Sequence, residues 1–267
     1  MSDTPVDTTV AHTARVWNYW LGGKDNYPPD REVGDRIREL FPEVVDAALG
    51  DRAFLRRAVT HLVEQEGVHQ FLDIGAGLPT ADNTHEVAQR LAPGSRVVYV
   101  DNDPLVLAHA RALLTGTDEG RTEFVDSDLR ETDRVLASAR EVLDFDRPIA
   151  LTLMGTMGHF PDLDEALGLV RAYVDALPAG SFLAVCDGVI SESVEMDPEK
   201  VAEFTRIWEG GVTLPYVPRA LEDFTRFFDG LDLVEPGVVS VTKWHPEPVE
   251  VGRARDLPQY CGLARVG

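Results

Sequence analysis

Helical patterns alternate with short β-rich runs from about residue 50 to residue 187, and this alternation constrains the fold more than any other feature. Such an alternation requires a parallel sheet that is covered by helices on both faces and joined by right-handed crossovers. The chain is therefore predicted to be α/β. The predicted strands are 68–77, 96–101, 121–126, 148–153 and 181–187, and the predicted helices are 51–67, 83–94, 103–114 and 162–180.

The order changes after residue 187. Residues 197–209 and 218–228 are predicted to be helical, and residues 231–244 and 259–266 are predicted to be closing strands that include an antiparallel one. We expect one α/β domain over residues 51–267, preceded by an N-terminal helical and aromatic extension over residues 1–50.

The charge of the chain limits its partners. Of its 267 residues, 46 are Asp or Glu and 25 are Lys or Arg, which gives a formal net charge of −21. A surface this acidic repels phosphate backbones, so nucleic acid is not expected to be a main partner.

The sequence predicts neither a membrane-spanning segment nor an export signal. No run approaches the ~20 apolar residues of a membrane span, and the polar start MSDTPVDTTVAHTA lacks the apolar core of a signal peptide. Cys186 and Cys261 lie in apolar runs, which favours buried reduced thiols over a disulfide. We therefore expect a cytoplasmic protein.

The first strand ends in the sequence Asp73-Ile74-Gly75-Ala76-Gly77. Two glycines around one residue let the backbone turn sharply and approach a ligand closely, although such loops also use glycine structurally. A dinucleotide site needs a third glycine that opens directly into a helix, but Thr80 stands there and the helix begins only after Asn83. No phosphate-binding loop motif is present.

The second and third strands also end in acidic residues. Asp103 is predicted to cap the helix that begins at Pro104, which leaves Asp101 to accept the hydroxyls of a ribose. Asp128 is placed to accept from an adenine amino group, with the Leu129 amide facing a ring nitrogen; the alternative is a turn aspartate.

Asp73 completes this set of strand-end groups. A carboxylate is favourable near a cationic amino acid and unfavourable near a pyrophosphate. The strand ends therefore suit a ligand with an amine, a ribose and an adenine but without phosphates, a description that S-adenosylmethionine fits.

The segments FLDIGAG, VVYVDND and FVDSDLR, in this order and spacing, resemble class I S-adenosylmethionine-dependent methyltransferases. More closely, ARVWNYWLGGKDNY, FLDIGAGLPTADNTHEVAQ and LMGTMGHFPD resemble a bacterial S-adenosyl methyltransferase family without a generally assigned substrate, over residues 12–266. The resemblance implies a Rossmann-like, seven-stranded, mostly parallel sheet of order 3-2-1-4-5-7-6 with an antiparallel seventh strand.

The resemblance also implies positions for the cofactor. Gly75 and Gly77 would lie beneath its methionine part, Asp101 on the ribose, and Asp128 and Leu129 at the adenine. Together with the groups assigned from the residues, the predicted S-adenosylmethionine site consists of Arg15, Tyr19, Asp73, Gly75, Ala76, Gly77, Asp101, Asn102, Asp128, Leu129, Leu153 and Met154.

The aromatic segment ARVWNYWLGGKDNYPPD (14–30) precedes any core strand. We expect it to fold back over the cofactor site, where Tyr19, Trp20 and Tyr27 would exclude water and cover the sulfonium. Arg15 would then pair with the cofactor carboxylate. The alternative is that Trp17 and Trp20, three residues apart, only fix the segment to the sheet.

His159 follows the fourth strand and is the best placed general base if the acceptor must first lose a proton; the alternative is a hydrogen-bonded loop histidine. Trp208, Tyr216 and Phe224 are candidates for an acceptor pocket, although helix packing explains them equally well. No cysteine or histidine spacing indicates a metal.

These features predict an S-adenosylmethionine-dependent methyltransferase. The N/D-P-P-Y/F tetrapeptide of many amino-methylating enzymes is absent after strand four, which favours a small-molecule acceptor, while a protein acceptor and a homodimer stay open. Two alternatives are an S-adenosylmethionine-binding protein without methyl transfer and a nicotinamide-dependent oxidoreductase. The missing third glycine and Asp73 argue against the oxidoreductase.

Overall fold

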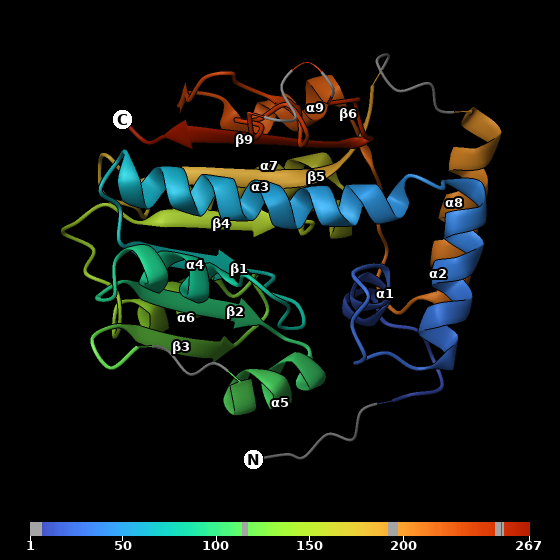
Figure 1. The fold of residues 1–267 in the computed structure, drawn as a ribbon, viewed down its shortest axis with the longest axis horizontal. Coiled ribbons are helices and arrows are strands. Elements are labelled where there is room, and N and C mark those ends of the chain that lie inside the picture. The colour runs from blue at the N-terminus through green and yellow to red at the C-terminus, as the bar shows by residue number, and fades with distance from the viewer. Residues whose placement is uncertain (1–6, 114–116, 192–196, 249–251, 253) are drawn as a thin grey trace.

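A computed structural model of the chain describes residues 7–113, 117–191, 197–248, 252 and 254–267 (Figure 1). Its strands are β1 (Gln70–Ile74), β2 (Arg96–Asp101), β3 (Arg121–Asp126), β4 (Ala150–Met154), β5 (Phe182–Ile190), β6 (Arg219–Ala220), β7 (Asp232–Leu233), β8 (Val239–Ser240) and β9 (Gln259–Arg265). Its α-helices are α1 (Thr13–Trp20), α2 (Pro28–Leu40), α3 (Val44–Glu64), α4 (Thr84–Leu91), α5 (Pro104–Leu113), α6 (Thr132–Ala139), α7 (Leu163–Val174), α8 (Pro198–Gly211) and α9 (Leu221–Thr225). Two 3-10 helices are η1 (Met157–His159) and η2 (Arg226–Phe228).

The strands form one sheet whose main path is β3-β2-β1-β4-β5-β9-β7, with β6 beside β5 and β8 beside β9. Strands β1 to β5 pair in parallel, and β9 is antiparallel to β5, β7 and β8. Among the seven strands of this path, β7 is the sixth and β9 the seventh in chain order. The α/β fold and the predicted order 3-2-1-4-5-7-6 are therefore confirmed.

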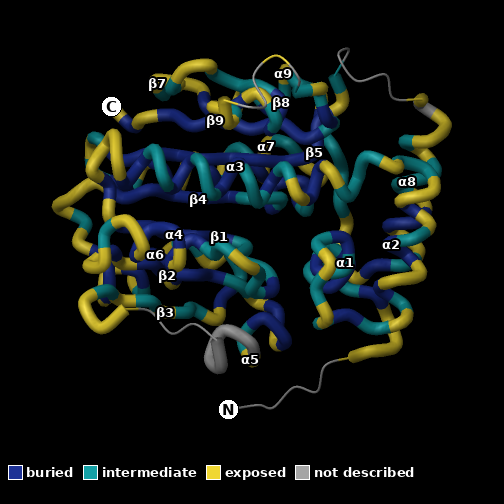
Figure 2. The backbone as a smooth tube through the Cα atoms, in the orientation of Figure 1, coloured by how far each residue is buried: buried dark blue, intermediate teal, exposed yellow. Residues whose placement is uncertain are grey.

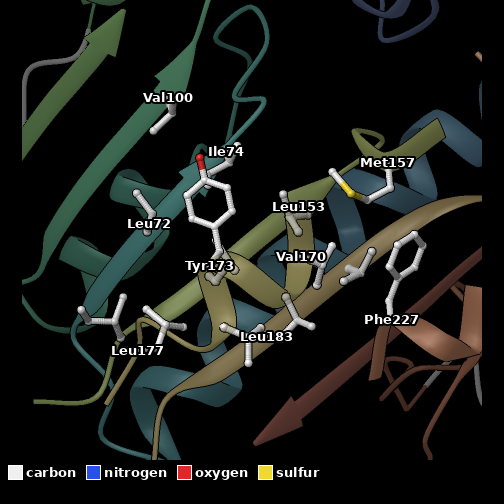
Figure 3. Close-up of a cluster of buried hydrophobic side chains, with 14 of the residues drawn as sticks. Leu72, Ile74, Val100, Leu153, Met157, Val170, Tyr173, Leu177, Leu183 and Phe227 are labelled. Atoms are coloured by element: carbon white, nitrogen blue, oxygen red, sulfur yellow. The ribbon is translucent and has the colours of Figure 1, made fainter. Parts of the chain in front are cut away.

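Alternation along the strands separates two cores. In β1, Leu72 and Ile74 face one side and Phe71 faces the other. Helices α6 and α7 cover the side of Leu72, where Tyr173 and Val170 of α7 point towards β1 and β4 (Figure 3). Helices α3 and α4 cover the opposite side (Figure 1).

A third cluster lies beyond the carboxyl ends of the parallel strands. There α1, α2 and α8 pack on one another, away from the sheet (Figures 1 and 2). Trp20 of α1 stacks at a tilt against Trp208 of α8, with ring centroids 6.3 Å apart, and its indole donates to the carbonyl of Gly34 in α2. The N-terminal segment is therefore joined to a late insertion in the sequence.

Several element boundaries differ from the sequence prediction. Helix α3 begins at Val44 rather than at residue 51, so it crosses the expected boundary between extension and domain. Residues 218–228 are not one helix: they contain β6, α9 and η2. Helix α6 was not predicted, and the expected strand 231–244 contains only the short β7 and β8.

Cys186 and Cys261 are register partners on β5 and β9, and both are buried and free, as expected. Over the described part of the chain, none of the helices has the length and hydropathy needed to cross a membrane.

Candidate functional site

A cavity of about 300 Å³ separates the carboxyl edge of the sheet from α1, α2 and α8. One half lies over the ends of β1, β2 and β3, and we call it the strand-end half. It is lined by Asp73, Gly75, Ala76, Gly77, Leu78, Thr80, Asp101, Asn102, Asp128 and Arg130. The other half, which we call the aromatic half, lies under the three helices.

The turn after β1 brings backbone close to the cavity. Gly75 has φ of +75°, and a Cβ atom there would lie 2.4 Å from Oγ1 of Thr156 in the loop after β4. A side chain at this position would therefore meet both backbone strain and a steric clash. The turn that follows Asp73 is thus fixed between the loops of β1 and β4.

Asp101 ends β2 and lines the cavity beside this turn. Its carboxylate accepts from the backbone amides of Gly77 at 2.8 Å and Asp103 at 2.9 Å. Burial raises the pKa of Asp101. Asp103 accepts from the amide of Leu105 at 2.8 Å and caps α5, as predicted.

Asp73 is buried on the α3 side of the strand-end half. Thr84 of α4 donates its hydroxyl to this carboxylate at 2.5 Å. Burial raises the pKa of Asp73, while Thr84 and the positive charge of Arg52 act in the opposite direction. A positively charged ligand group in the cavity would meet this carboxylate.

Asp128 lines the cavity and also forms a turn. It accepts from the amide of Arg130 at 2.8 Å, and the side-chain amide of Asn102 lies 3.4 Å away. Leu129 and Leu153 do not line the cavity. Leu153 points into the α7-side core because it follows the alternation of β4 (Figure 3), whereas Met154 lines the cavity.

Arg15 is not free to pair with a cofactor, and this prediction was wrong. Its side chain is 3% exposed and its Nε donates to Asp30 at 3.0 Å. The other two nitrogens donate to the carbonyls of Asp7 and Val10. The guanidinium is occupied within the N-terminal segment and does not line the cavity.

The aromatic residues of this segment divide between two tasks. Trp17 and Trp20 line the cavity, and their rings meet edge to face with centroids 5.5 Å apart. Tyr19 does not line it, because its hydroxyl donates to Asp35 of α2 at 2.8 Å. Tyr27 precedes α2 as its N-cap residue and is also outside the cavity wall. The tryptophans pack on α2 and α8, not on the sheet.

Two of the three late aromatic residues also line the cavity. Trp208 lies on α8 and Tyr216 follows it, whereas Phe224 is buried in the core with Phe227 and Phe228. A Cβ atom on Gly158 would lie 2.4 Å from the Tyr216 ring, so this ring position depends on glycine. The Tyr216 hydroxyl donates to Asp187 within β5.

His159 lines the cavity between these residues and the sheet. Its Nδ1 lies 2.6 Å from the carbonyl of Pro215, and since a carbonyl only accepts, Nδ1–H is the donor. Burial lowers the pKa of His159, although Pro215 and Asp187 oppose this effect. The neutral ring then keeps a lone pair on Nε2, which is the form that a general base requires.

The cavity is also lined by Asp51, Arg52 and Gln259, to which no role was assigned from the sequence. Asp51 of α3 is 3% exposed and accepts from the side-chain amide of Gln259 at 2.9 and 3.0 Å. The next residue, Arg52, donates to the carbonyls of Ala81 and Asp82, and its Nε is buried without a hydrogen-bond partner among the described residues. Within the same residues, no group of three side chains is suited to hold a metal ion.

The chain is similar to proteins of one family over its whole length. The model of the S-adenosyl methyltransferase family matches residues 1–267. Among solved structures, a DUF574 family protein from Streptomyces avermitilis is 41% identical, with a TM-score of 0.91, covering 98% of this chain and 100% of that chain. A protein from Thermobifida fusca is 37% identical, with a TM-score of 0.84 and coverage of 97% and 96%.

More distant likenesses concern the fold alone. The mitomycin 7-O-methyltransferase is 16% identical, with a TM-score of 0.53, and the match covers 90% of this chain and 69% of that chain. A search of curated proteins found no match.

Proposed function

This chain belongs to the S-adenosyl methyltransferase family and is an S-adenosylmethionine-dependent methyltransferase, and from this premise we propose that it methylates a small molecule bound in the aromatic half of the cavity. The observation that carries the proposal is the division of one cavity into a strand-end half and an aromatic half.

The residues of the strand-end half fit the cofactor. A Cβ atom at Gly77 would meet nothing within 4 Å, so there is open space above this turn, and the buried Nε of Arg52 lacks a partner among the described residues. When bound, S-adenosylmethionine would supply a methyl carbon on a sulfonium: the acceptor lone pair forms a bond to this carbon as its bond to sulfur breaks, and neutral S-adenosylhomocysteine is the leaving group. We assign Asp101 and Asn102 to the ribose, Asp128 to the adenine, and the turn from Gly75 to Gly77 to the methionine part.

Arg52 replaces Arg15 as our candidate for the cofactor carboxylate. Its guanidinium lines the cavity and carries the unpartnered Nε, and it interacts electrostatically with Asp73. A half-buried guanidinium and a buried carboxylate on one side of the cavity suit the two charges of an amino-acid group. Asp73 would face the ammonium and Arg52 the carboxylate.

The N-terminal extension over residues 1–50 is proposed to cover both ligands. His12, Thr13 and Ala14 line the strand-end half, while Trp17 and Trp20 line the aromatic half. One short helix therefore borders both halves. Excluding water and holding the acceptor in line are two contributions that protein residues make to a displacement at carbon.

His159 is our candidate for the general base. Its Nδ1–H is held by Pro215, which fixes the ring and leaves Nε2 to take a proton from an acceptor that carries one. Its loop follows β4, where the two halves of the cavity meet.

A small acceptor is supported by the size and cover of the cavity. The whole cavity, which would hold both the cofactor and the acceptor, has a volume of about 300 Å³, at the lower end of the range of small-molecule sites. Helices α1, α2 and α8 cover it. The net charge of −21 opposes nucleic acid. The cytoplasmic location stays a prediction from the sequence.

A labelling experiment tests the acceptor class. The protein is incubated with S-adenosylmethionine labelled in its methyl group and a Streptomyces avermitilis extract, which is then separated into small molecules, protein and nucleic acid. We expect label in the small-molecule fraction, and at least about tenfold slower labelling when Asp101→Asn replaces the wild type at a subsaturating concentration of S-adenosylmethionine. Label confined to protein or nucleic acid would contradict the proposal.

A further inference from the structure

Asp51 lies on the opposite side of the cavity from the ends of β2 and β3. Its hydrogen-bond partners are Gln259 of β9 and Cys186 of β5. A Cβ atom on Gly155, directly after β4, would lie 3.8 Å from its Oδ2. In the sheet order β3-β2-β1-β4-β5-β9, these neighbours lie on β5 and β9 or directly after β4. Asp51 therefore lies over that part of the carboxyl edge, away from Asp101 and Asp128 at the ends of β2 and β3.

The carboxylate of Asp51 has only neutral hydrogen-bond partners. The amide of Gln259 and the thiol of Cys186 donate to it, and it forms no ion pair with any residue that the structure describes. A buried carboxylate in such surroundings carries a desolvation cost that a further donor or a cation would offset. Since Asp51 lines the cavity, a bound ligand can provide that group.

Aromatic rings line the same cavity as Asp51. They belong to Trp17, Trp20, Phe41, Phe204, Trp208 and Tyr216, which come from α1, α8 and the segments that follow α2 and α8. Rings of this kind present flat apolar surfaces and attract cations through their faces. They favour a flat, largely apolar body.

The charges that line the cavity oppose an anion. Four aspartates line it, but only two arginines do, among the residues described. Arg130 pairs with Glu165 at 2.8 Å, and Arg52 donates to the carbonyls of Ala81 and Asp82. The positive charge of Arg52 acts electrostatically on Asp51, but neither guanidinium is hydrogen-bonded to it. Because Arg52 is our candidate for the cofactor carboxylate, an acidic acceptor would meet Asp51 without a cation of its own.

We propose that Asp51 receives the polar group of the methyl acceptor, and that the acceptor is a flat aromatic molecule without negative charge that carries an N–H or O–H group at one edge. The inference rests on the proposed function and defines its substrate class. The aromatic half binds the body of the molecule, and Asp51 accepts the hydrogen bond of its polar group.

Matched naphthalene probes test this inference. The full chain is saturated with S-adenosylhomocysteine at about pH 8.5, above the raised pKa of Asp51, so that its carboxylate is ionised. The affinities of 2-naphthol, 2-naphthylmethylamine, 2-naphthoate and naphthalene are then measured by calorimetry and by quenching of tryptophan fluorescence. We expect the amine and the naphthol to bind about tenfold more tightly than the naphthoate, as a hydrogen bond to a charged group predicts. Asp51→Asn should weaken the amine about tenfold and change naphthalene less than about twofold.

Asp46→Asn is the matched control, since Asp46 lies on the same helix but pairs with Arg255 outside the cavity wall. It should leave all four affinities unchanged. Equal binding of the amine, naphthol and naphthoate, or no binding of the amine and naphthol, would overturn the inference.

The affinity for the cofactor distinguishes a role of Asp51 in acceptor binding from a role in cofactor binding. Asp51→Asn should keep the wild-type affinities for S-adenosylhomocysteine and S-adenosylmethionine, which also shows that it is folded. Selective loss of S-adenosylmethionine affinity would mean that Asp51 serves the sulfonium, and would overturn the inference. Failure of the wild type to bind either compound would instead contradict the cofactor assignments, and the probe series measured without cofactor would still decide the role of Asp51.

Discussion

Nδ1 of His12 lies 3.0 Å from Oδ2 of Asp103, and this contact joins the N-terminal segment to the end of β2. Asp103 in turn donates its amide to Asp101, the ribose candidate. The segment is therefore connected to the strand-end half through two residues.

We expect His12→Ala to speed the dissociation of S-adenosylhomocysteine. Loss of this partly exposed contact with a carboxylate corresponds to about fivefold in rate, if the segment must open before the cofactor leaves. Stopped-flow tryptophan fluorescence measures this rate. His69→Ala, at the opposite end of β1, is the control and should change nothing; an unchanged rate in His12→Ala would mean that the segment is only structural.

Arg15→Leu should destabilise the protein by about 3–5 kcal/mol, because it leaves the buried Asp30 without its cation. Arg38→Leu removes an exposed pair with Asp35 on α2 and should cost less than about 1 kcal/mol. Urea unfolding measures both. If Arg15→Leu kept full stability but lost affinity for S-adenosylhomocysteine, the sequence-based role of Arg15 would be restored.

His159 should make the protein less stable as the pH falls below 6.5. Burial lowers the pKa of this ring, so the unfolded chain binds more protons in that range and the unfolding free energy falls with pH. His159→Gln should show a smaller loss between pH 7.5 and pH 5.5, measured by denaturant unfolding. Equal losses would show that His159 titrates normally, and NMR of the ring nitrogens would then show protonation near pH 6.5.

The titration of Asp51 should change the unfolding free energy with pH in the direction opposite to that of His159. Burial raises the pKa of Asp51 to about 7, so the folded chain binds more protons than the unfolded chain between about pH 4 and pH 7. This group therefore lowers the unfolding free energy as the pH rises through that window. The stability of Asp51→Asn relative to the wild type should increase from pH 5 to pH 8, with Asp46→Asn as the flat reference, and a decrease would contradict the burial argument.

The sequence predicted the sheet and the strand-end residues because both depend on local patterns. Apolar runs that alternate with helical patterns predict β1 to β5. The residues that follow such parallel strands must lie at one edge of the sheet, as Gly75, Asp101 and Asp128 do. The cap formed by Asp103 is equally local.

Pairings between distant residues were not predictable in the same way. Arg15 meets Asp30 only after α1 and α2 pack together, so no local pattern showed that its charge was already paired. Asp51 was missed because α3 was expected to begin there; in the longer helix it shares the buried face of Ala47, Phe54 and Leu55. That helical spacing was the available signal.

The claim that Asp101 at the end of β2 binds the cofactor is tested by calorimetric titration with S-adenosylhomocysteine. The titration compares the wild type with Asp101→Asn and Asp126→Asn. Asp126 is the register partner of Asp101 on β3, but it is exposed and does not line the cavity. We predict that the wild type and Asp126→Asn bind equally and that Asp101→Asn binds about tenfold to a hundredfold more weakly. Equal affinities in all three proteins, or no binding by the wild type, would contradict it.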